Sequence, residues 1–318
     1  MKVRVSPIKI INRDGYKLFG IFHEPDISRP SIAILILSPG IKSRVAPHRL
    51  YIKMAERFTN LGFCVLRIDP TGLGDSEGEI DEFYTADVYG SMELGRLVND
   101  TIDAMNWLQE THSINRFILS GLCGGAITGL LVGAMDQRVD SLLSLGMTCI
   151  VTGSTVDSTR YITKGQLTSM RQKYFSKLLK PSAWLRLITL QSDFRLMFKS
   201  LIKPFLSHSS QQKTNAPESN FLPPSNTNLN PHFPPAFFSF VRNRKILMIF
   251  SEVDRLYWEF QEKFVDHYGN RVKSYQHNMS IHIVKNANHV FSFSEWQREM
   301  LELSTQWLKR LYGELPSV

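Results

Sequence analysis

Short apolar runs alternate with amphipathic stretches along most of this chain. Residues 31–37 and 63–68 are largely apolar, which predicts strands that are buried on both faces of a sheet. Residues 48–60 and 86–110 instead repeat apolar side chains at helical spacing. Strands that alternate with helices favour a mostly parallel sheet covered by helices on both faces. The same reasoning predicts further strands at residues 116–120, 142–149, 245–251 and 280–284, and further helices at 126–135, 257–267 and 295–311.

The N-terminal region has the pattern of a β-hairpin. Two strand-like segments, residues 3–12 and 16–23, flank Arg13-Asp14-Gly15. An aspartate followed by glycine between two such segments is typical of a tight turn. The hairpin therefore precedes the alternating strands and helices.

The alternation breaks between residues 151 and 240. Residues 155–208 read as helical, whereas residues 207–239 are rich in Ser, Asn and Pro. So many prolines prevent regular structure, so we expect a long, partly disordered loop there. The interpretation is one α/β core, formed by residues 1–150 and 241–318, that is interrupted by a helical cap followed by this loop.

The composition is that of an ordinary globular protein. Hydrophobic residues make up 43% and charged residues 21% of the 318 positions, which excludes a largely disordered or fibrous chain. The three cysteines, Cys64, Cys123 and Cys149, are too few for a disulfide framework and form no metal-type pair. We therefore expect free thiols and no bound metal or cofactor. The absence of a recognisable secretory signal or membrane-spanning run predicts a cytoplasmic protein.

The net charge of +8 is concentrated in one segment. Residues 151–240 hold eleven Lys or Arg and three Asp or Glu, and the rest of the chain is balanced. A basic face of this kind contacts a phosphate-bearing substrate, an acidic partner or a lipid surface, or it only keeps the protein soluble. The segment has no nucleic-acid motif, so a nucleic-acid partner is not expected.

A glycine-flanked cysteine follows the strand predicted at residues 116–120. The sequence Gly121-Leu122-Cys123-Gly124-Gly125 matches G-x-C-x-G, a nucleophile elbow with cysteine in place of serine. The turn from strand to helix leaves no room for side chains at the flanking glycines. It also places the sulfur at the positive end of a helix, where a thiolate is favoured. The alternative is a buried cysteine in a glycine-rich turn.

Candidate partners for the cysteine follow two later strands. Asp254 comes just after the strand at 245–251, and His289 comes after the strand that ends at residue 284. The order nucleophile, acid, histidine is that of α/β hydrolases. Three competitors remain: Glu252 in place of Asp254, His282 in place of His289, and Ser120 as the nucleophile. We expect His282 to lie inside a strand and Ser120 to face the core.

A glycine-rich loop follows the buried strand at 63–68. Residues 66–78 contain three glycines in seven positions and lie at the end of a strand, where α/β proteins place their sites. The spacing G-x-G-x-S-x-G lacks the third glycine of a dinucleotide-binding loop, so nucleotide binding is disfavoured.

These motifs resemble the α/β-hydrolase superfamily over nearly the whole chain outside the insertion. Residues 44–49 (RVAPHR), the glycine-rich loop and Gly121-Leu122-Cys123 are similar to bacterial hydrolases of the exosortase A system-associated type. The elbow also resembles that of dienelactone hydrolases, which use a cysteine. The elbow here is Gly-Leu-Cys-Gly-Gly rather than Gly-Leu-Cys-Asp-Gly, and the Pro- and Asn-rich insertion is foreign to the exosortase-associated group.

The resemblance implies a role for each site residue. Cys123 attacks an acyl carbonyl, His289 transfers the proton, and Asp254 orients the imidazole. The N–H groups of Gly124 and Ile41 would form the oxyanion hole.

A basic cluster opens the helix predicted at residues 48–60. Arg44, His48 and Arg49 would bind a substrate carboxylate or phosphate. The alternative is a salt-bridged helix start without contact to substrate.

A thiol nucleophile suits activated acyl groups better than amides. We therefore expect a hydrolase of small-molecule acyl esters or thioesters, with the acyl group carried on coenzyme A or an acyl carrier protein. Acyl transfer to another acceptor with the same triad is a close alternative. A second alternative is a non-catalytic binding protein that docks to a partner or an anionic membrane through residues 184–206.

Overall fold

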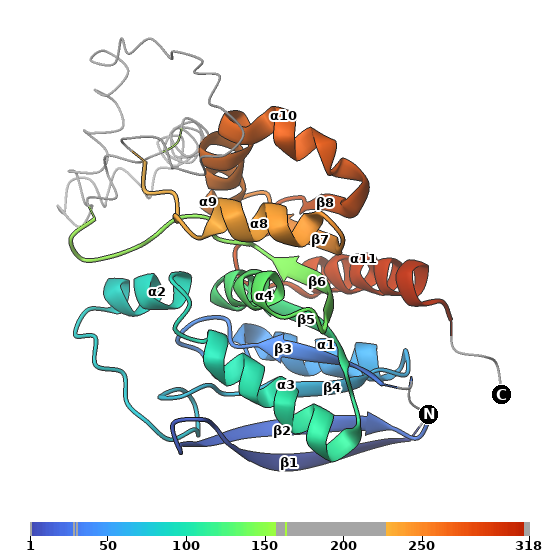
Figure 1. Cartoon of the computed structure of the whole chain (residues 1–318). Helices are drawn as coiled ribbons and strands as arrows, with labels where there is room; N and C mark the ends of the chain where they lie inside the picture. The colour runs from blue at the N-terminus through green and yellow to red at the C-terminus, as the bar shows by residue number, and fades with distance from the viewer. Residues whose placement is uncertain (1, 28, 30, 157–162, 164–226, 315–318) are drawn as a thin grey trace, which may run out of the picture. The chain divides into compact units, whose positions relative to one another are not determined.

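The computed structural model describes residues 2–27, 29, 31–156, 163 and 227–314. Within this part of the chain, one sheet of eight strands runs in the order β1-β2-β4-β3-β5-β6-β7-β8 (Figure 1). Strand β2 is antiparallel to both of its neighbours, and the strands from β4 to β8 are parallel. The strands are β1 (Val3–Ile11), β2 (Lys17–Pro25), β3 (Ile32–Leu37), β4 (Cys64–Ile68), β5 (Arg116–Leu122), β6 (Val139–Leu145), β7 (Lys245–Ser251) and β8 (Met279–Val284).

Helices cover both faces of the sheet. On one face, α1 and α11 share a hydrophobic core with inward-facing residues of β3 and β4. On the other face, α4 packs against β5 and β6 and contacts α2, α3 and α8. The helices are η1 (Pro47–Arg49), α1 (Leu50–Thr59), α2 (Thr85–Glu93), α3 (Val98–His112), α4 (Gly124–Met135), α8 (Phe233–Val241), α9 (Arg255–Glu259), η3 (Phe260–Val265), α10 (Asp266–Ser274), η4 (Gln276–Asn278) and α11 (Ser294–Tyr312).

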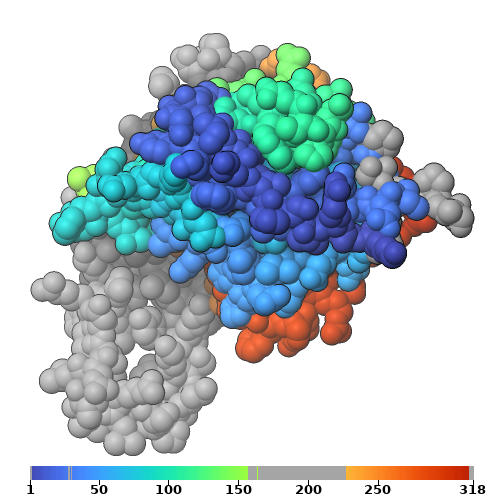
Figure 2. Space-filling view, turned by 90° about the horizontal axis from the view of Figure 1, so that it is seen from below, coloured from blue at the N-terminus to red at the C-terminus, as the bar shows by residue number. Residues whose placement is uncertain are grey.

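The predicted α/β architecture is confirmed. All six residues of β3 are buried, as expected for an apolar strand covered on both faces. The hairpin predicted around Arg13-Asp14-Gly15 joins β1 and β2. Figure 2 shows this hairpin, in dark blue, between α3 on one side and α1 and α11 on the other.

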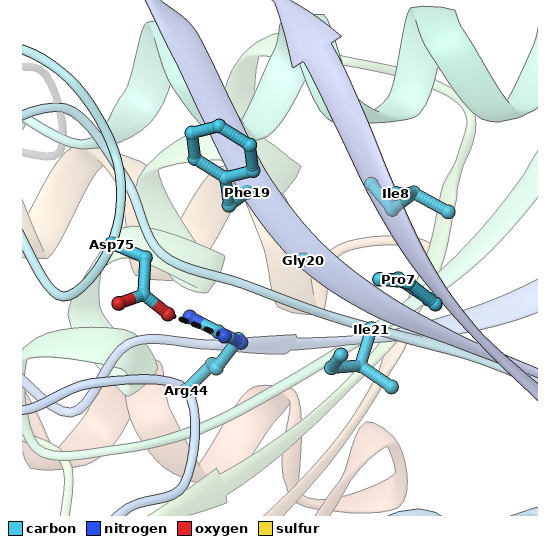
Figure 3. A pocket seen from close by; sticks show the side chains of 7 residues that line it. All are labelled: Pro7, Ile8, Phe19, Gly20, Ile21, Arg44 and Asp75. Carbon is cyan, nitrogen blue, oxygen red and sulfur yellow. Dashed lines mark hydrogen bonds and ion pairs between the residues drawn. The ribbon is translucent and has the colours of Figure 1, made fainter.

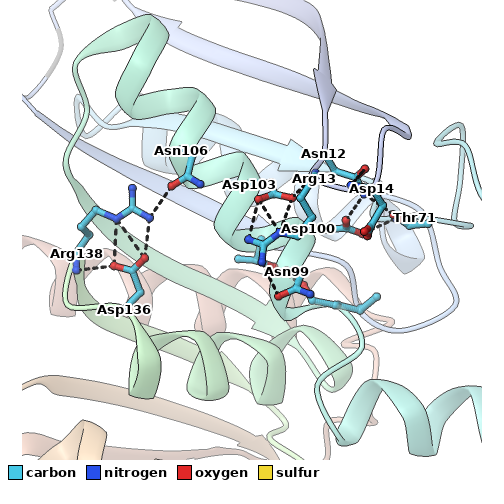
Figure 4. A network of polar contacts seen from close by, with 12 residues as sticks. Asn12, Arg13, Asp14, Thr71, Asn99, Asp100, Asp103, Asn106, Asp136 and Arg138 are labelled. Atoms are coloured by element: carbon cyan, nitrogen blue, oxygen red, sulfur yellow. Dashed lines mark hydrogen bonds and ion pairs between the residues drawn. The ribbon is translucent and has the colours of Figure 1, made fainter.

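The hairpin turn is fastened to α3 and to the glycine-rich loop. Asp100 of α3 accepts hydrogen bonds from Asn12 Nδ2 (2.8 Å) and from the Thr71 N–H (2.7 Å). Arg13 pairs with Asp103 one turn later, with Nη2 2.8 Å from Oδ1 (Figure 4). These contacts hold the loop of residues 66–78 at the end of β4.

One predicted helix is in fact two. Residues 86–110 were expected to form a single helix, but α2 ends at Glu93 and α3 begins at Val98. Gly95 lies between them with φ of 108°, a conformation that only glycine adopts readily. The apolar spacing continues across the break, so periodicity alone did not reveal it. The break allows α2 to lie beside the elbow with an orientation of its own.

The prediction of an irregular loop over residues 207–239 is wrong at its C-terminal end. Residues 233–241 form α8, and Pro234 and Pro235 occupy its first turn. Proline is tolerated there because the first N–H groups of a helix have no partner within the helix. Residues 227–232 of that loop are described and form neither a helix nor a strand, whereas residues 207–226, and the predicted cap apart from residues 151–156 and 163, lie outside the described residues.

The two ends of the insertion meet at the core. The Val151 N–H donates to the Asn228 carbonyl, and the Asn230 N–H donates to the Cys149 carbonyl, each at 2.8 Å. The chain outside residues 158–222 groups into one compact unit. Among the helices in the described ranges, none has the length and apolar character needed to cross a membrane.

Candidate active site

The backbone at Cys123 has the sharp turn that the elbow motif predicts. Cys123 lies between β5 and α4 with φ of 53° and ψ of −108°, a strained conformation for a residue with a side chain. A Cβ atom on Gly121 would lie 2.6 Å from the Gly125 carbonyl carbon. A Cβ on Gly125 would lie 2.4 Å from the Leu37 carbonyl oxygen. Both distances are far below normal contact, so this turn requires glycine on both sides of the cysteine.

The structure brings Cys123, His289 and Asp254 together. His289 Nδ1 lies 2.6 Å from Asp254 Oδ2, and the imidazole is close enough to the Cys123 side chain for the sulfur to raise its pKa. Backbone contact joins the two loops that carry these residues, because the Val253 N–H donates to the Ala287 carbonyl. The Asp254 side chain is only 9% exposed, while that of His289 is 38% exposed. The histidine is thus held from its buried side and remains partly exposed.

The electrostatics of this arrangement favour a charged histidine. Burial by itself would lower the pKa of His289. Its hydrogen bonds to Asp254 and Cys123, and the negative charges of these groups, outweigh burial and raise the pKa to about 10. At neutral pH the imidazole is therefore an imidazolium between the carboxylate and the sulfur.

The three competing residues lie elsewhere. Ser120 is completely buried in β5, and its hydroxyl contacts no described hydrogen-bond partner. Glu252 is exposed and accepts a hydrogen bond from the Asn286 N–H, so it shapes the turn before His289. His282 lies inside β8, as expected, with an exposed side chain. None of the three belongs to the grouping of Cys123, His289 and Asp254.

The expected oxyanion donors lie on adjoining segments. A Cβ on Gly124 would lie 3.2 Å from the Gly40 nitrogen, so the loop after β3 packs directly on the start of α4. The Ser38 hydroxyl lies 2.8 Å from the Gly40 carbonyl oxygen. Because the peptide is planar and trans, the Ile41 N–H points away from Ser38. Neither this N–H nor that of Gly124 donates to another described residue, so both are free to bind an oxygen atom.

Two tyrosines beside Cys123 were not predicted from the sequence. Tyr51 of α1 is fully buried, and its hydroxyl accepts the Leu122 N–H at 2.7 Å. Tyr89 of α2 is half-buried and packs on Gly40. The charge of Cys123 contributes to a raised pKa for both phenols, after the larger effect of burial. Neither residue belongs to a motif, because its place depends on contacts between helices and loops distant in sequence.

Arg44 forms the salt bridges that were the alternative to substrate binding. Its guanidinium pairs with the fully buried Asp69 and, at 2.6 Å, with Asp75. Figure 3 shows Arg44 and Asp75 at the edge of a cavity of about 310 Å³ that is otherwise lined by residues of β1 and β2. None of the three triad candidates lines this cavity. His48 and Arg49 are exposed at η1, so a substrate contact for them stays a prediction.

The fold has counterparts among known proteins. A family model described as the alpha/beta hydrolase fold matches residues 33–244. The chain belongs to the α/β-hydrolase fold family. The superfamily resemblance inferred from the elbow and the residue order is thereby confirmed.

One curated relative is a transferase. The polyketide transferase grgF from a Penicillium species is 27% identical over 154 residues, which are 47% of this chain and 47% of that protein. The match therefore spans about half the length of this relative.

Solved structures share the fold at low identity. The esterase Pf2001 from Pyrococcus furiosus has a TM-score of 0.54 and 17% identity, with 96% of this chain and 92% of that chain covered. GrgF from Penicillium sp. has a TM-score of 0.53 and 17% identity, covering 96% and 98%. A dienelactone hydrolase from Anabaena variabilis has a TM-score of 0.50 and 14% identity, covering 98% and 99%. Such low identities establish the shared fold alone.

The side chains that the structure describes include no group of three or more His, Cys, Asp or Glu arranged to hold a metal ion.

Proposed function

We propose that this α/β hydrolase is an enzyme that cleaves an acyl ester or thioester through an acyl-Cys123 intermediate. The observation that carries the proposal is the grouping of Asp254, His289 and Cys123 at a strained elbow, with the imidazole hydrogen-bonded to the carboxylate and beside the sulfur. The fold family, with an esterase and a transferase among the similar proteins, supports an enzyme that acts on ester-type bonds.

The first half-reaction forms the acyl-enzyme. The Cys123 thiolate attacks the acyl carbonyl carbon, and the carbonyl electrons move to the oxygen, where the N–H groups of Ile41 and Gly124 stabilise the negative charge. When the tetrahedral intermediate collapses, the bond to the leaving group breaks. The imidazolium of His289 gives its proton to the departing alkoxide or thiolate. The products are a free alcohol or thiol and an acyl group on Cys123.

Acylation prepares the histidine for the second half-reaction. A thioester sulfur carries no charge, so two of the influences that raise the pKa of His289 disappear. The pKa of His289 therefore falls from about 10, and the neutral imidazole becomes a general base. It removes a proton from water, the hydroxide attacks the acyl carbon, and the carboxylic acid leaves as the Cys123 thiolate and the imidazolium are restored.

Acyl transfer is a second candidate, favoured by one observation. The relative with 27% identity is a polyketide transferase. In a transferase the same acyl-Cys123 intermediate is attacked by an alcohol or amine instead of water, and His289 removes the proton of that acceptor. The two candidates share every step up to the acyl-enzyme.

The carrier of the acyl group is a finer part of the proposal. The basic residues of 151–240 would favour a phosphate-bearing carrier such as coenzyme A, an acidic acyl carrier protein, or contact with an anionic membrane surface. Most of these residues lie outside the described part of the chain. The similarity to exosortase-associated hydrolases likewise stays a prediction.

The test compares wild type with Cys123→Ala on a panel of acyl-coenzyme A thioesters and aryl esters. We expect turnover in wild type and none in the variant, together with an acyl adduct on Cys123 detected by intact mass. Cys64→Ala is the matched control, because this thiol is buried in β4, and it should keep wild-type rates. An adduct that is released only when an alcohol or amine is added would favour the transferase. If wild type shows neither turnover nor an adduct, the hydrolase and the transferase are both contradicted, and a binding protein is favoured.

A further inference from the structure

Tyr89 reaches from α2 onto the loop that supplies an expected oxyanion donor. A Cβ atom on Gly40 would lie 2.8 Å from Tyr89 Cε1, so the ring packs directly on this residue. Gly40 in turn lies against Gly124, the residue after the nucleophile. The tyrosine ring therefore contacts the residue that precedes the Ile41 N–H, and it is near enough to Cys123 for the charge of the sulfur to act on its pKa.

The Tyr89 hydroxyl is available as a hydrogen-bond donor. The side chain is half-buried, and its hydroxyl bonds to no other residue in the described ranges. Burial and the negative charges of Cys123 and Glu93 raise the pKa of Tyr89. The phenol thus stays protonated at neutral and mildly alkaline pH. Tyr51, the other phenol near Cys123, is fully buried and already accepts the Leu122 N–H, so it is not open to substrate.

The helix that carries Tyr89 is fixed by the loop after β6. Asp87 and Glu93 accept hydrogen bonds from the N–H groups of Ser154 (2.7 Å) and Thr152 (2.5 Å). A Cβ on Gly90 would lie 2.1 Å from the Thr152 carbonyl oxygen, so the helix and this loop are in close backbone contact. A donor on an element held this firmly is oriented before substrate arrives, which is the condition for useful transition-state stabilisation.

We propose that the Tyr89 hydroxyl donates a third hydrogen bond to the carbonyl oxygen of the acyl group, beside the N–H groups of Ile41 and Gly124. The inference rests on the proposed function, since it requires acylation of Cys123. As the sulfur attacks, charge builds up on that oxygen and the hydrogen bond from Tyr89 strengthens without transfer of its proton. Because the bond is stronger in the transition state than in the bound substrate, it acts on kcat more than on KM.

The test is Tyr89→Phe, which keeps the ring on Gly40 and removes only the donor. We expect kcat for ester and thioester cleavage to fall about 10- to 100-fold, with KM within about twofold and an unchanged melting temperature. Alkylation of Cys123 by iodoacetamide provides a second measurement, because this displacement forms no oxyanion. Its rate should match wild type. Tyr84→Phe is the matched control, since Tyr84 is exposed at the start of the same helix, and it should leave all rates unchanged.

Three outcomes would overturn the proposal in different ways. A kcat in Tyr89→Phe within twofold of an active wild type would remove the oxyanion role and leave the proposed function intact. If the rates of substrate cleavage and of alkylation fall equally, Tyr89 acts on the reactivity or the position of the Cys123 thiol and not on the oxyanion. No acyl-Cys123 in wild type would overturn the proposed function and this inference together.

Discussion

At the scale of single residues, environment separates three thiols of the same chemical type. Cys123 is partly exposed beside His289, whereas Cys64 and Cys149 are buried. Burial, with the charge of Glu24, raises the pKa of Cys64 to about 11. Burial and the charge of Glu259 raise the pKa of Cys149 further. Two of the three thiols are thus held protonated, and only Cys123 has an imidazolium beside it.

Iodoacetamide should therefore discriminate between the cysteines. At pH 7 we expect Cys123 to be alkylated at least about tenfold faster than Cys64 or Cys149, because the thiolate is the reactive form. Peptide mapping of the labelled sites over time measures the three rates. His289→Ala should remove most of the difference. Slow and equal labelling of all three cysteines in wild type would contradict an activated Cys123.

The titration of His289 offers a second test at this scale. Its pKa of about 10 exceeds the usual value of 6.5, so the native state binds this proton more tightly than the unfolded state. The resulting stabilisation is complete below pH 6.5 and is lost as the pH rises through 10. NMR of labelled histidine should show His289 protonated at pH 8 in wild type. In Cys123→Ala its pKa should be lower, because the hydrogen bond and charge of the sulfur are gone. Identical titration curves in the two proteins would contradict this coupling.

At the scale of elements, the site depends on how closely β3, β5 and α4 approach. The elbow fits only because Gly121 and Gly125 have no side chains. A second close approach joins α2 to the loop after β6. Glu93 of α2 is only 4% exposed, and its carboxylate accepts hydrogen bonds from the N–H and the hydroxyl of Thr152. These contacts fix both Cys123 and the helix that carries Tyr89.

Gly125→Ala should disrupt the packing of the elbow. The new methyl group would lie 2.4 Å from the Leu37 carbonyl oxygen, so backbone must move, at a cost of about 3 kcal/mol in unfolding free energy. Urea unfolding measures the loss, and activity should fall with it. Gly269→Ala is the matched control, because nothing lies within 4 Å of its Cβ position, and its stability should equal or slightly exceed wild type. Equal stability of the two variants would mean that the elbow tolerates a side chain.

Glu93 should make stability depend on pH. Burial raises its pKa to about 7, although hydrogen bonds from Thr152 and Thr148 oppose the rise. The native state therefore favours the protonated carboxyl, and this contribution to stability decreases as the pH rises from 4.5 to 7. As the pH rises from 4.5 to 8, the free energy of unfolding of Glu93→Gln should increase relative to that of wild type by up to roughly 3 kcal/mol, because the variant has no carboxyl to ionise.

Urea unfolding at the two pH values tests this difference. Glu110→Gln, which changes an exposed glutamate of α3, is the control and should keep the wild-type pH dependence. If Glu93→Gln shows the same pH dependence as wild type, the carboxyl of Glu93 does not titrate in this range.

At the scale of the whole molecule, a single sheet is completed by segments from both sides of the insertion. Strands β1 to β6 precede the insertion, and β7 and β8 follow it, yet β6 and β7 are neighbours in the sheet. Cys123 therefore comes from the first part of the chain, and Asp254 and His289 come from the second. Assembly of the site requires that the two ends of the insertion meet.

The core should consequently fold without the insertion. The pairing of Val151 with Asn228 and of Cys149 with Asn230 holds the ends together, so replacing residues 157–226 by a short Gly/Ser linker should preserve cooperative thermal unfolding. Calorimetry and far-UV circular dichroism measure this. Extending the replacement through residue 230 removes those bonds and should lower the melting temperature markedly. Loss of cooperative unfolding in the first variant would show that the core depends on the insertion.

The sequence by itself determined the elements and the order of the chemistry. Apolar runs identified the buried strands, because a strand covered on both faces has no polar side. The elbow motif predicted Cys123 as the nucleophile, and the positions of Asp254 and His289 just after strands predicted them as its partners, since parallel strands end at a common edge. These features depend on residues close together in the sequence.

Only the tertiary structure decided the features that depend on distant contacts. Periodicity continued across Gly95 and did not separate α2 from α3, and the proline content concealed α8. Pairing with Asp69 and Asp75 showed that Arg44 is not a free cation. The place of Tyr89 beside Cys123 depends on how α2 packs against two loops. Local sequence sets backbone preference, whereas burial, charge pairing and a side chain's partners are set by residues that only folding brings near.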